Sequence, residues 1–180
     1  MVVSQFSTIT IATNRYSVPS RLIGSTILVR VRSEHLEGYV GTTRVFEIPR
    51  LIGKHHHRID YHHVIHALVR KPGAFAAYRF RDDLFPTTTF RQAYDRLVSD
   101  AGTRANREYV RILHLAATTS EVEVETALQI VLEERKLPSF LTVRDLVQVP
   151  SMRSVPTLST PELNLGSYDQ LIPSARRACV

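Results

Sequence analysis

The chain has 180 residues, of which 43% are hydrophobic, a formal net charge of +6 and a single cysteine. This length fits one ordinary domain or two very small ones, and no apolar run is long enough to cross a bilayer. The first ten residues lack the basic and apolar parts of a signal peptide, and the lone Cys179 excludes an internal disulfide. We therefore expect a soluble, cytoplasmic protein.

The positive charge is concentrated in the first two thirds of the chain. Residues 1–54 and 55–120 each carry a net charge of +4, whereas residues 121–180 carry −2. Arginine supplies 20 of the 23 basic residues, and its forked guanidinium suits phosphate oxygens better than the lysine ammonium does. Such a charge permits contact with nucleic acid but does not require it, since many soluble proteins are basic.

Residues 4–50 alternate between apolar and polar side chains, as β-strands do. The segments STITIAT, RYSVP, TILVRVR, HLEGYVG and TRVFEIP predict five short strands, with Thr13-Asn14 forming the first turn. Five short strands in fewer than fifty residues predict a small antiparallel β-barrel over residues 1–52, because closing the sheet removes its exposed edges.

The next part of the chain, residues 53–149, shows the apolar period of helices separated by short links, which predicts an antiparallel helical bundle. The expected helices span about residues 60–71, 89–101, 104–117, 120–131 and 142–148. Their expected N-terminal caps are Asp60, Thr89 with Gln92, Ser120 with Glu123, and Thr142 with Asp145. The predicted fold class is therefore α+β.

From Pro150 onward the chain is rich in proline and serine and has little periodicity, so we expect residues 150–180 to form a mostly disordered, flexible tail. The island LNLGSYDQLI is apolar enough to dock on a partner protein, or to fold back on the chain's own helices. Its candidate docking residues are Leu163, Leu165, Tyr168, Leu171 and Ile172.

Six histidines lie between His55 and His66. His62 and His66 have the spacing with which a helix presents two ligands to one metal ion. No glutamate completes a His-Glu-x-x-His motif, no cysteine is near, and Asp60 serves better as a helix cap. We therefore expect no metal site, and favour an exposed face that gains charge below about pH 6.5 and meets phosphate.

The sequence also lacks the usual signatures of catalysis. It has no Gly-x-Ser-x-Gly motif and no phosphate-cradling glycine loop. Asp82 and Asp83 are adjacent, so one of them should point away from any shared site. Glu121, Glu123 and Glu125 lie at an expected helix start, where acidic residues favour the helix dipole. We expect no active site.

Basic residues gather at three places: one face of the third strand, an aromatic-rich segment over residues 69–86, and a stripe on the third helix that continues to His114. Basic side chains among aromatic ones suit a nucleic-acid backbone. The aromatic residues also fit packing between barrel and helices, and the stripe also fits an ordinary solvated helix face. The candidate DNA-binding residues are Arg30, Arg32, Arg70, Lys71, Arg79, Arg81, Arg104, Arg107 and Arg111.

Five segments in order between residues 5 and 148 carry a family resemblance: TNRYSVP, VRVRSEHLEGYVGTTRVFEIPR, DYHHVIHALVRKPGAF, LFPTTTFRQAYDRL and REYVRILHLAA. Together they resemble the C-terminal part of IstA-type insertion-sequence transposases, members of the DDE (retroviral-integrase-like) group and relatives of phage Mu transposase. Residues 16–19 (Tyr-Ser-Val-Pro) and 71–74 (Lys-Pro-Gly-Ala) carry most of the resemblance, and LGSYDQL in the tail is similar to the family's ending. Phe75 departs from the leucine that is more usual after Lys-Pro-Gly-Ala.

The resemblance implies a division of labour in which this part helps to organise the DNA–protein assembly. A helix-turn-helix region and a ribonuclease-H-like domain with three Mg²⁺-binding carboxylates are the family's other parts. The chain would then be a non-catalytic, truncated or separately expressed region without a cofactor of its own. Its implied partners are double-stranded DNA, other transposase subunits and a AAA+ helper ATPase, at the bacterial nucleoid and not at a membrane.

Two functions stay open at this point. A DNA-binding and assembly module predicts an affinity that falls steeply with salt and shows little sequence preference. A protein-interaction module that docks the helper ATPase or another subunit predicts a complex that survives moderate salt.

Overall fold

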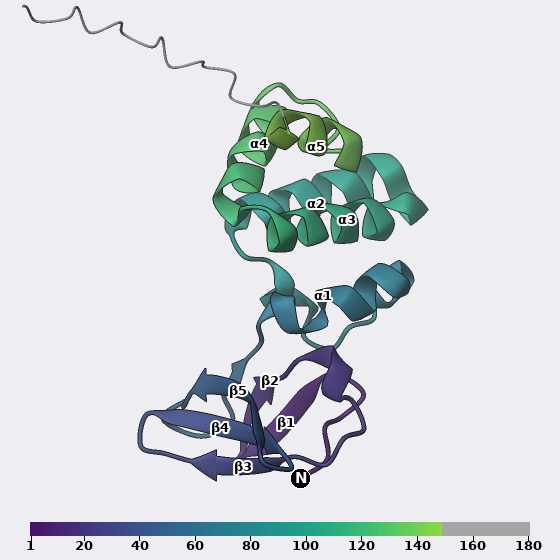
Figure 1. The fold of residues 1–180 in the computed structure, drawn as a ribbon. Coiled ribbons are helices and arrows are strands. Elements are labelled where there is room, and N and C mark those ends of the chain that lie inside the picture. The colour runs from purple at the N-terminus through teal and green to yellow at the C-terminus, as the bar shows by residue number, and fades with distance from the viewer. Residues whose placement is uncertain (149–180) are drawn as a thin grey trace, which may run out of the picture. The chain divides into compact units, whose positions relative to one another are not determined.

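The computed structural model describes residues 1–148, which have an α+β fold (Figure 1). The tail island predicted to dock on a partner lies outside these residues. The strands are β1 (Thr8–Ile11), β2 (Asn14–Ser17), β3 (Leu28–Val31), β4 (His35–Val40), β5 (Thr43–Pro49) and β6 (His57–Arg58). The helices are α1 (Tyr61–Arg70), α2 (Thr88–Ala101), α3 (Ala105–Thr118), α4 (Glu121–Glu133) and α5 (Phe140–Gln148).

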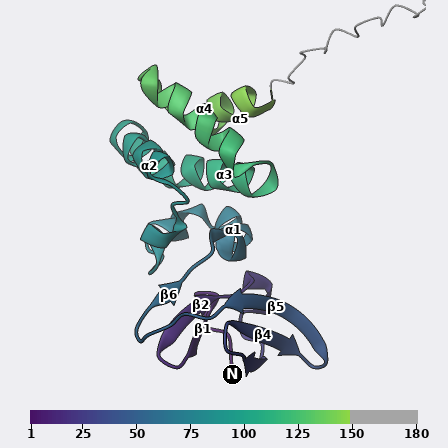
Figure 2. The same ribbon diagram turned by 90° about the vertical axis from the view of Figure 1, so that its left-hand side faces the viewer.

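The strands form two three-stranded sheets instead of the closed barrel predicted from the sequence. One sheet has the order β1-β2-β6 and the other β3-β4-β5, and all pairs are antiparallel except β2 with β6. The connection from β2 to β3 contains a short 3-10 turn, η1 (Ser20–Leu22), and no ladder joins these two strands in the described part of the chain. The two sheets nevertheless lie beside each other (Figure 2). They share one hydrophobic cluster, to which Ile9 and Tyr16 contribute from one sheet and Leu36 and Ile48 from the other.

The first hairpin turns one residue earlier than the sequence indicates. Ala12 and Thr13 form the turn with positive φ values of 47° and 72°, the left-handed conformation of a two-residue hairpin. Asn14 is therefore the first residue of β2, and its side chain is buried. Its amide donates to the carbonyl of Gly53 at 2.9 Å and accepts from the N–H of His56 at 2.9 Å. These bonds hold the loop that leads into β6.

Two of the predicted helix caps are confirmed. Asp60 precedes α1, and its carboxylate accepts a hydrogen bond from the N–H of His62 at 2.9 Å. Ser120 precedes α4, and its hydroxyl accepts from the N–H of Glu123 at 3.4 Å. Each bond satisfies one of the backbone donors that a helix start leaves without a partner.

The other two predicted caps are wrong. Helix α2 begins at Thr88, and Thr89 is buried inside its first turn, so its hydroxyl is not free to cap. Helix α5 begins at Phe140 instead of Thr142, because two groups satisfy its first donors. The carboxylate of Glu108 accepts from the N–H of Phe140 at 2.9 Å, and the hydroxyl of Ser139 accepts from the N–H of Thr142 at 3.2 Å.

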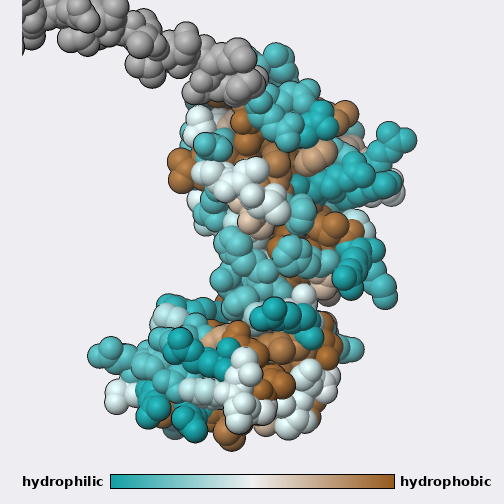
Figure 3. All heavy atoms as spheres, in the orientation of Figure 1, coloured by the Kyte–Doolittle hydropathy of each residue, from teal (hydrophilic) through white to brown (hydrophobic). Residues whose placement is uncertain are grey.

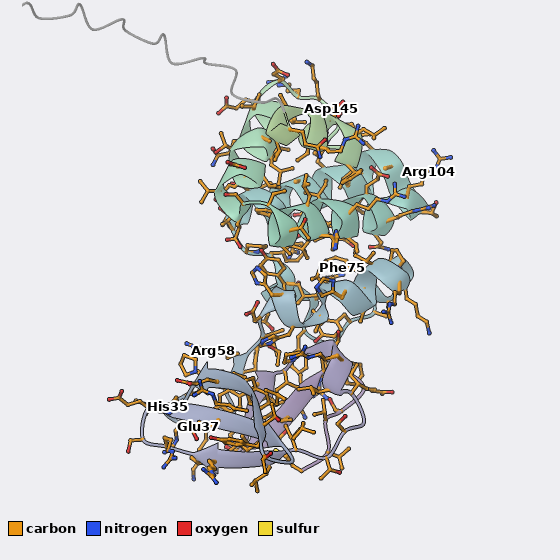
Figure 4. The ribbon with its side chains drawn as sticks, in the orientation of Figure 1. His35, Glu37, Arg58, Phe75, Arg104 and Asp145 are labelled. Carbon is orange, nitrogen blue, oxygen red and sulfur yellow. The ribbon has the colours of Figure 1, made fainter. Side chains whose placement is uncertain are left out.

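The helices pack around α3, which contacts α1, α2, α4 and α5. Their apolar faces form a second hydrophobic cluster, separate from that of the sheets. An aromatic group lies within it: the ring centre of Phe75 is 5.9, 5.2 and 5.0 Å from those of Phe85, Tyr94 and Tyr109 (Figure 4). Phe75 is fully buried, so the residue that departs from the family pattern serves as core. None of the described helices has the length and apolarity needed to span a bilayer.

Candidate nucleic-acid interface

A groove of about 1000 Å³ lies between α1 and the segments on either side of the β1–β2 hairpin. Three cationic side chains line it: Arg21 of η1, Arg70 at the end of α1, and the following Lys71. No aspartate or glutamate is among the described residues that line it. The groove is therefore a concave surface with an excess of positive charge, which concentrates the field that an anion meets.

The groove cations have no ion-pair partner among residues 1–148, and all three are exposed. Arg70 lies in the last turn of α1, where the helix dipole also favours a positive charge. Because no carboxylate has to be displaced, a phosphate that enters the groove gains the full attraction of these charges. Arg70 and Lys71 were expected to contact DNA from the sequence, whereas Arg21 was not.

The histidine cluster divides between two cavities. His62, His63 and His66 line the groove, whereas His55 to His57 line a second cavity. His63 Nδ1 lies 2.8 Å from the hydroxyl of Ser17, and burial is the main cause that lowers the pKa of His63, so its ring tends to stay neutral. Within residues 1–148, no group of three or more His, Cys, Asp or Glu side chains is placed to hold a metal ion.

The second cavity measures about 520 Å³ and carries mixed charge. The guanidinium carbons of Arg15 and Arg79 lie 5.8 and 5.7 Å from the ring centre of Phe80. His57 Nε2 lies 3.0 Å from a carboxylate oxygen of Asp83, so this cavity contains an acidic group that the groove lacks. Of the arginines here, only Arg79 was expected from the sequence to bind DNA.

The strand-face patch is partly neutralised by a carboxylate. The guanidinium of Arg30 lies 4.9 Å from the ring centre of Tyr39, whereas Arg32 Nε lies 3.3 Å from Glu37 Oε1. Glu37 also accepts hydrogen bonds from the hydroxyl of Tyr39 at 2.9 Å and from His35 Nε2 at 3.2 Å. Hydrogen bonds from Tyr39, His35 and Arg32, in that order, lower the pKa of Glu37 to about 2. Arg32 is thus paired within its own sheet, and Arg30 is not.

Arg81 is also less available than the sequence indicates. Its Nε is buried and has no hydrogen-bond partner among the described residues, and its Nη2 lies 3.6 Å from Asp82. Part of this guanidinium therefore faces the protein and not solvent.

The arginine stripe is present and mostly exposed, with Arg104 just before α3 and Arg107 and Arg111 on it. Arg104 and Arg107 form no ion pair with residues 1–148, and Arg104 points away from the helices (Figure 4). Arg111 Nη1 lies 3.9 Å from Glu108, a long and weak pairing. The stripe continues through His114, whose ring centre lies 5.8 Å from that of His66 at the groove. The stripe and the groove are thus neighbours through these two histidines.

Residues 1–60 match a family model described as Mu transposase, C-terminal domain. The chain is therefore similar to this domain over its first 60 residues. The match ends just after β6 and includes Asp60, the cap of α1. It confirms the expected resemblance to the C-terminal region of a transposase.

Individual relatives match most of the chain, and two of them are named transposases. An uncharacterized protein of Sinorhizobium fredii is 37% identical over 166 residues, covering 89% of this chain and 33% of that protein. Transposases for insertion sequences IS1326/IS1353 from Pseudomonas aeruginosa and Shigella flexneri are each 29% identical over 173 residues, covering 88% of this chain and 33% of theirs. The chain thus spans about one third of the length of these relatives. No solved structure matches it.

Proposed function

We propose that this transposase region binds the DNA backbone and helps to assemble a transposition complex, without catalysing strand cleavage or joining itself. The observation that carries the proposal is the groove, where Arg21, Arg70 and Lys71 meet no carboxylate among the described lining residues. Cations of this kind neutralise phosphates and position DNA without reading its bases. The match to a C-terminal transposase domain supports the same role and a place at the bacterial nucleoid.

The groove and the stripe on α3 form the proposed interface. His66 at the groove contacts His114 of the stripe, so Arg104 and Arg107 continue the positively charged surface beyond the groove. Arg111 adds a further positive charge, which its weak pairing with Glu108 partly offsets. Arg30 and Arg79 are secondary contacts. Arg32 and Arg81 contribute least. Arg32 is paired with Glu37, and Nε of Arg81 is buried in the protein.

The first test removes the two cations at the end of α1. We expect Arg70→Gln with Lys71→Gln to weaken binding to a labelled duplex. The slope of log affinity against log salt should become shallower by about two, since each phosphate contact contributes roughly 0.9. Fluorescence anisotropy between about 50 and 200 mM salt measures this slope. Duplexes of unrelated sequence should give the same result.

The matched control removes the same charge elsewhere. Arg135 and Lys136 follow α4 and line neither cavity, so Arg135→Gln with Lys136→Gln should change the slope much less. Equal effects of the two double substitutions would mean that net charge alone binds DNA. A salt-independent affinity of the unaltered chain would overturn the proposal.

Exposed apolar side chains on α4 and α5 favour a second candidate function, the docking of a AAA+ helper ATPase or another transposase subunit. Val122 is 72% exposed and Leu141 57% exposed. Such a complex should persist at about 200 mM salt, and its affinity should not change when Arg70 and Lys71 are replaced with glutamine. The tail residues Leu163 to Ile172 remain candidates for the same docking, which their deletion would test by loss of helper binding.

A further inference from the structure

The lining of the groove is apolar as well as cationic, and we call its apolar part the floor. Phe6, Ile23 and Tyr78 line it together with the aliphatic face of α1. Ile23 is 40% exposed, and Figure 3 shows hydrophobic side chains at the surface of the sheet region beside hydrophilic ones. A charged phosphate gains nothing from contact with apolar side chains. The floor therefore indicates that the ligand also has an apolar part.

Phe6 is the aromatic side chain of this floor that lies outside both hydrophobic clusters. It is partly exposed. Its backbone is nevertheless fixed on both sides: its N–H donates to the hydroxyl of Ser4 at 3.3 Å, and its carbonyl accepts from the hydroxyl of Tyr78 at 2.9 Å. Its ring meets that of Tyr78 edge to face, with ring centres 6.3 Å apart. The ring is held in place, with part of its surface open.

An open aromatic ring beside unpaired cations suits unpaired nucleotides better than a duplex. In a duplex the flat faces of the bases are stacked inside, and a protein surface meets only backbone and base edges. In a single strand the bases present their faces to aromatic side chains while cations follow the phosphates, and this stacking tolerates any sequence.

We propose that the groove binds an unpaired DNA strand, with phosphates at Arg21, Arg70 and Lys71 and at least one base stacked on Phe6. The proposal rests on the proposed function, because it takes the groove cations as phosphate contacts. It narrows the ligand from DNA in general to single-stranded or locally opened DNA.

The test compares a labelled single strand of about 16 nucleotides with the duplex of the same sequence, each titrated with the full chain and with Phe6→Ala. Loss of one stacked base should weaken single-strand binding by about 5- to 150-fold. Duplex binding should change by less than about twofold. Phe6→Trp, which keeps an aromatic face, should retain the affinity for the single strand. Because Phe6 lies outside both clusters, these variants should keep the thermal stability of the parent chain.

Two results would overturn the inference. One is an unchanged single-strand affinity in Phe6→Ala, or an equal loss for both DNA forms. The other is a glutamate-rich peptide that displaces the single strand equally well from the parent chain and from Phe6→Ala. The groove would then recognise negative charge alone, which favours an acidic protein partner.

The failure of this inference can be told apart from failure of the proposed function. If Arg70→Gln with Lys71→Gln flattens the salt dependence for duplex DNA while Phe6→Ala has no effect, DNA binding stands and only the unpaired strand is excluded. If neither form of DNA binds in a salt-dependent manner, both proposals are wrong.

Discussion

At the scale of single residues, Gly38 has the least space for a side chain among the glycines of residues 1–148. It lies in β4, and a β-carbon there would overlap the ring of Phe46, which belongs to the hydrophobic cluster of the sheets. Gly38→Ala should therefore push Phe46 out of its position and destabilise the protein by about 1–3 kcal/mol. Chemical denaturation monitored by circular dichroism measures this change.

Gly73 provides the control for this substitution. No atom lies within 4 Å of a β-carbon built there, and its φ is not in the left-handed region. Gly73→Ala should leave the free energy of unfolding nearly unchanged. Replacing Phe46 with leucine in the Gly38→Ala background should recover part of the loss. Equal stability of the two alanine variants would contradict the packing seen between β4 and β5.

Glu37 gives the sheets a stability that depends on pH. Its pKa falls from 4.5 to about 2 on folding, because the carboxylate accepts bonds from Tyr39, His35 and Arg32. The folded state thus binds this proton less readily than the unfolded chain. The resulting stabilisation is fully present above about pH 4.5 and is lost as the pH falls towards 2.

Glu37→Gln should remove this contribution without changing the size of the side chain. The parent chain should have the higher melting temperature at about pH 7, and the difference should shrink at about pH 3. Thermal unfolding at both pH values gives the comparison. A difference that stays constant across this range would show that the carboxylate's charge is not what stabilises the sheet.

At the scale of elements, a single serine joins β2 to the start of α1. The hydroxyl of Ser17 accepts from the N–H of Asp60 at 2.8 Å and lies 2.8 Å from His63 Nδ1, to which it can donate. Ser17→Ala leaves both groups without this partner at a partly buried place, which should cost about 1 kcal/mol in urea denaturation. Ser99→Ala is the control, since this exposed hydroxyl bonds only to a carbonyl of its own helix. Similar losses in the two variants would argue against the link.

Periodicity predicted the five longer strands and the existence of all five helices, because each buries a regular apolar face. It gave no sign of β6, which consists of His57 and Arg58 and contains no apolar residue. This strand depends on the buried Asn14, whose bonds to the 53–56 loop exist only once the chain has folded. The failed cap at Thr89 has a similar cause, since burial of that side chain outweighed its local pattern.

The candidate interface was predictable to the extent that it is local. Arg70 and Lys71 adjoin a helix end that the sequence marks with proline and glycine. Arg21 lines the same groove from a 3-10 turn about fifty residues earlier in the sequence. A local sequence pattern cannot predict that two such distant segments lie side by side. Arg32 was predicted to bind DNA, but its side chain lies beside Glu37, a carboxylate of the neighbouring strand β4.

At the scale of the molecule, residues 1–148 have two hydrophobic clusters, and the groove lies where the elements of one meet those of the other. Two of the hydrogen bonds that cross this boundary lie beside the groove: the N–H of Asp60 donates to the hydroxyl of Ser17, and the hydroxyl of Tyr78 donates to the carbonyl of Phe6. The shape of the proposed DNA site therefore depends on contacts between the clusters as well as on each cluster alone.

The short strand β6 also bears on aggregation. It pairs in parallel with β2 and covers the edge that β2 would otherwise present. A fragment that ended at residue 52, before β6, would leave backbone donors and acceptors of that edge open to a second chain. Two residues without any apolar side chain thus help to keep the sheet region from self-association.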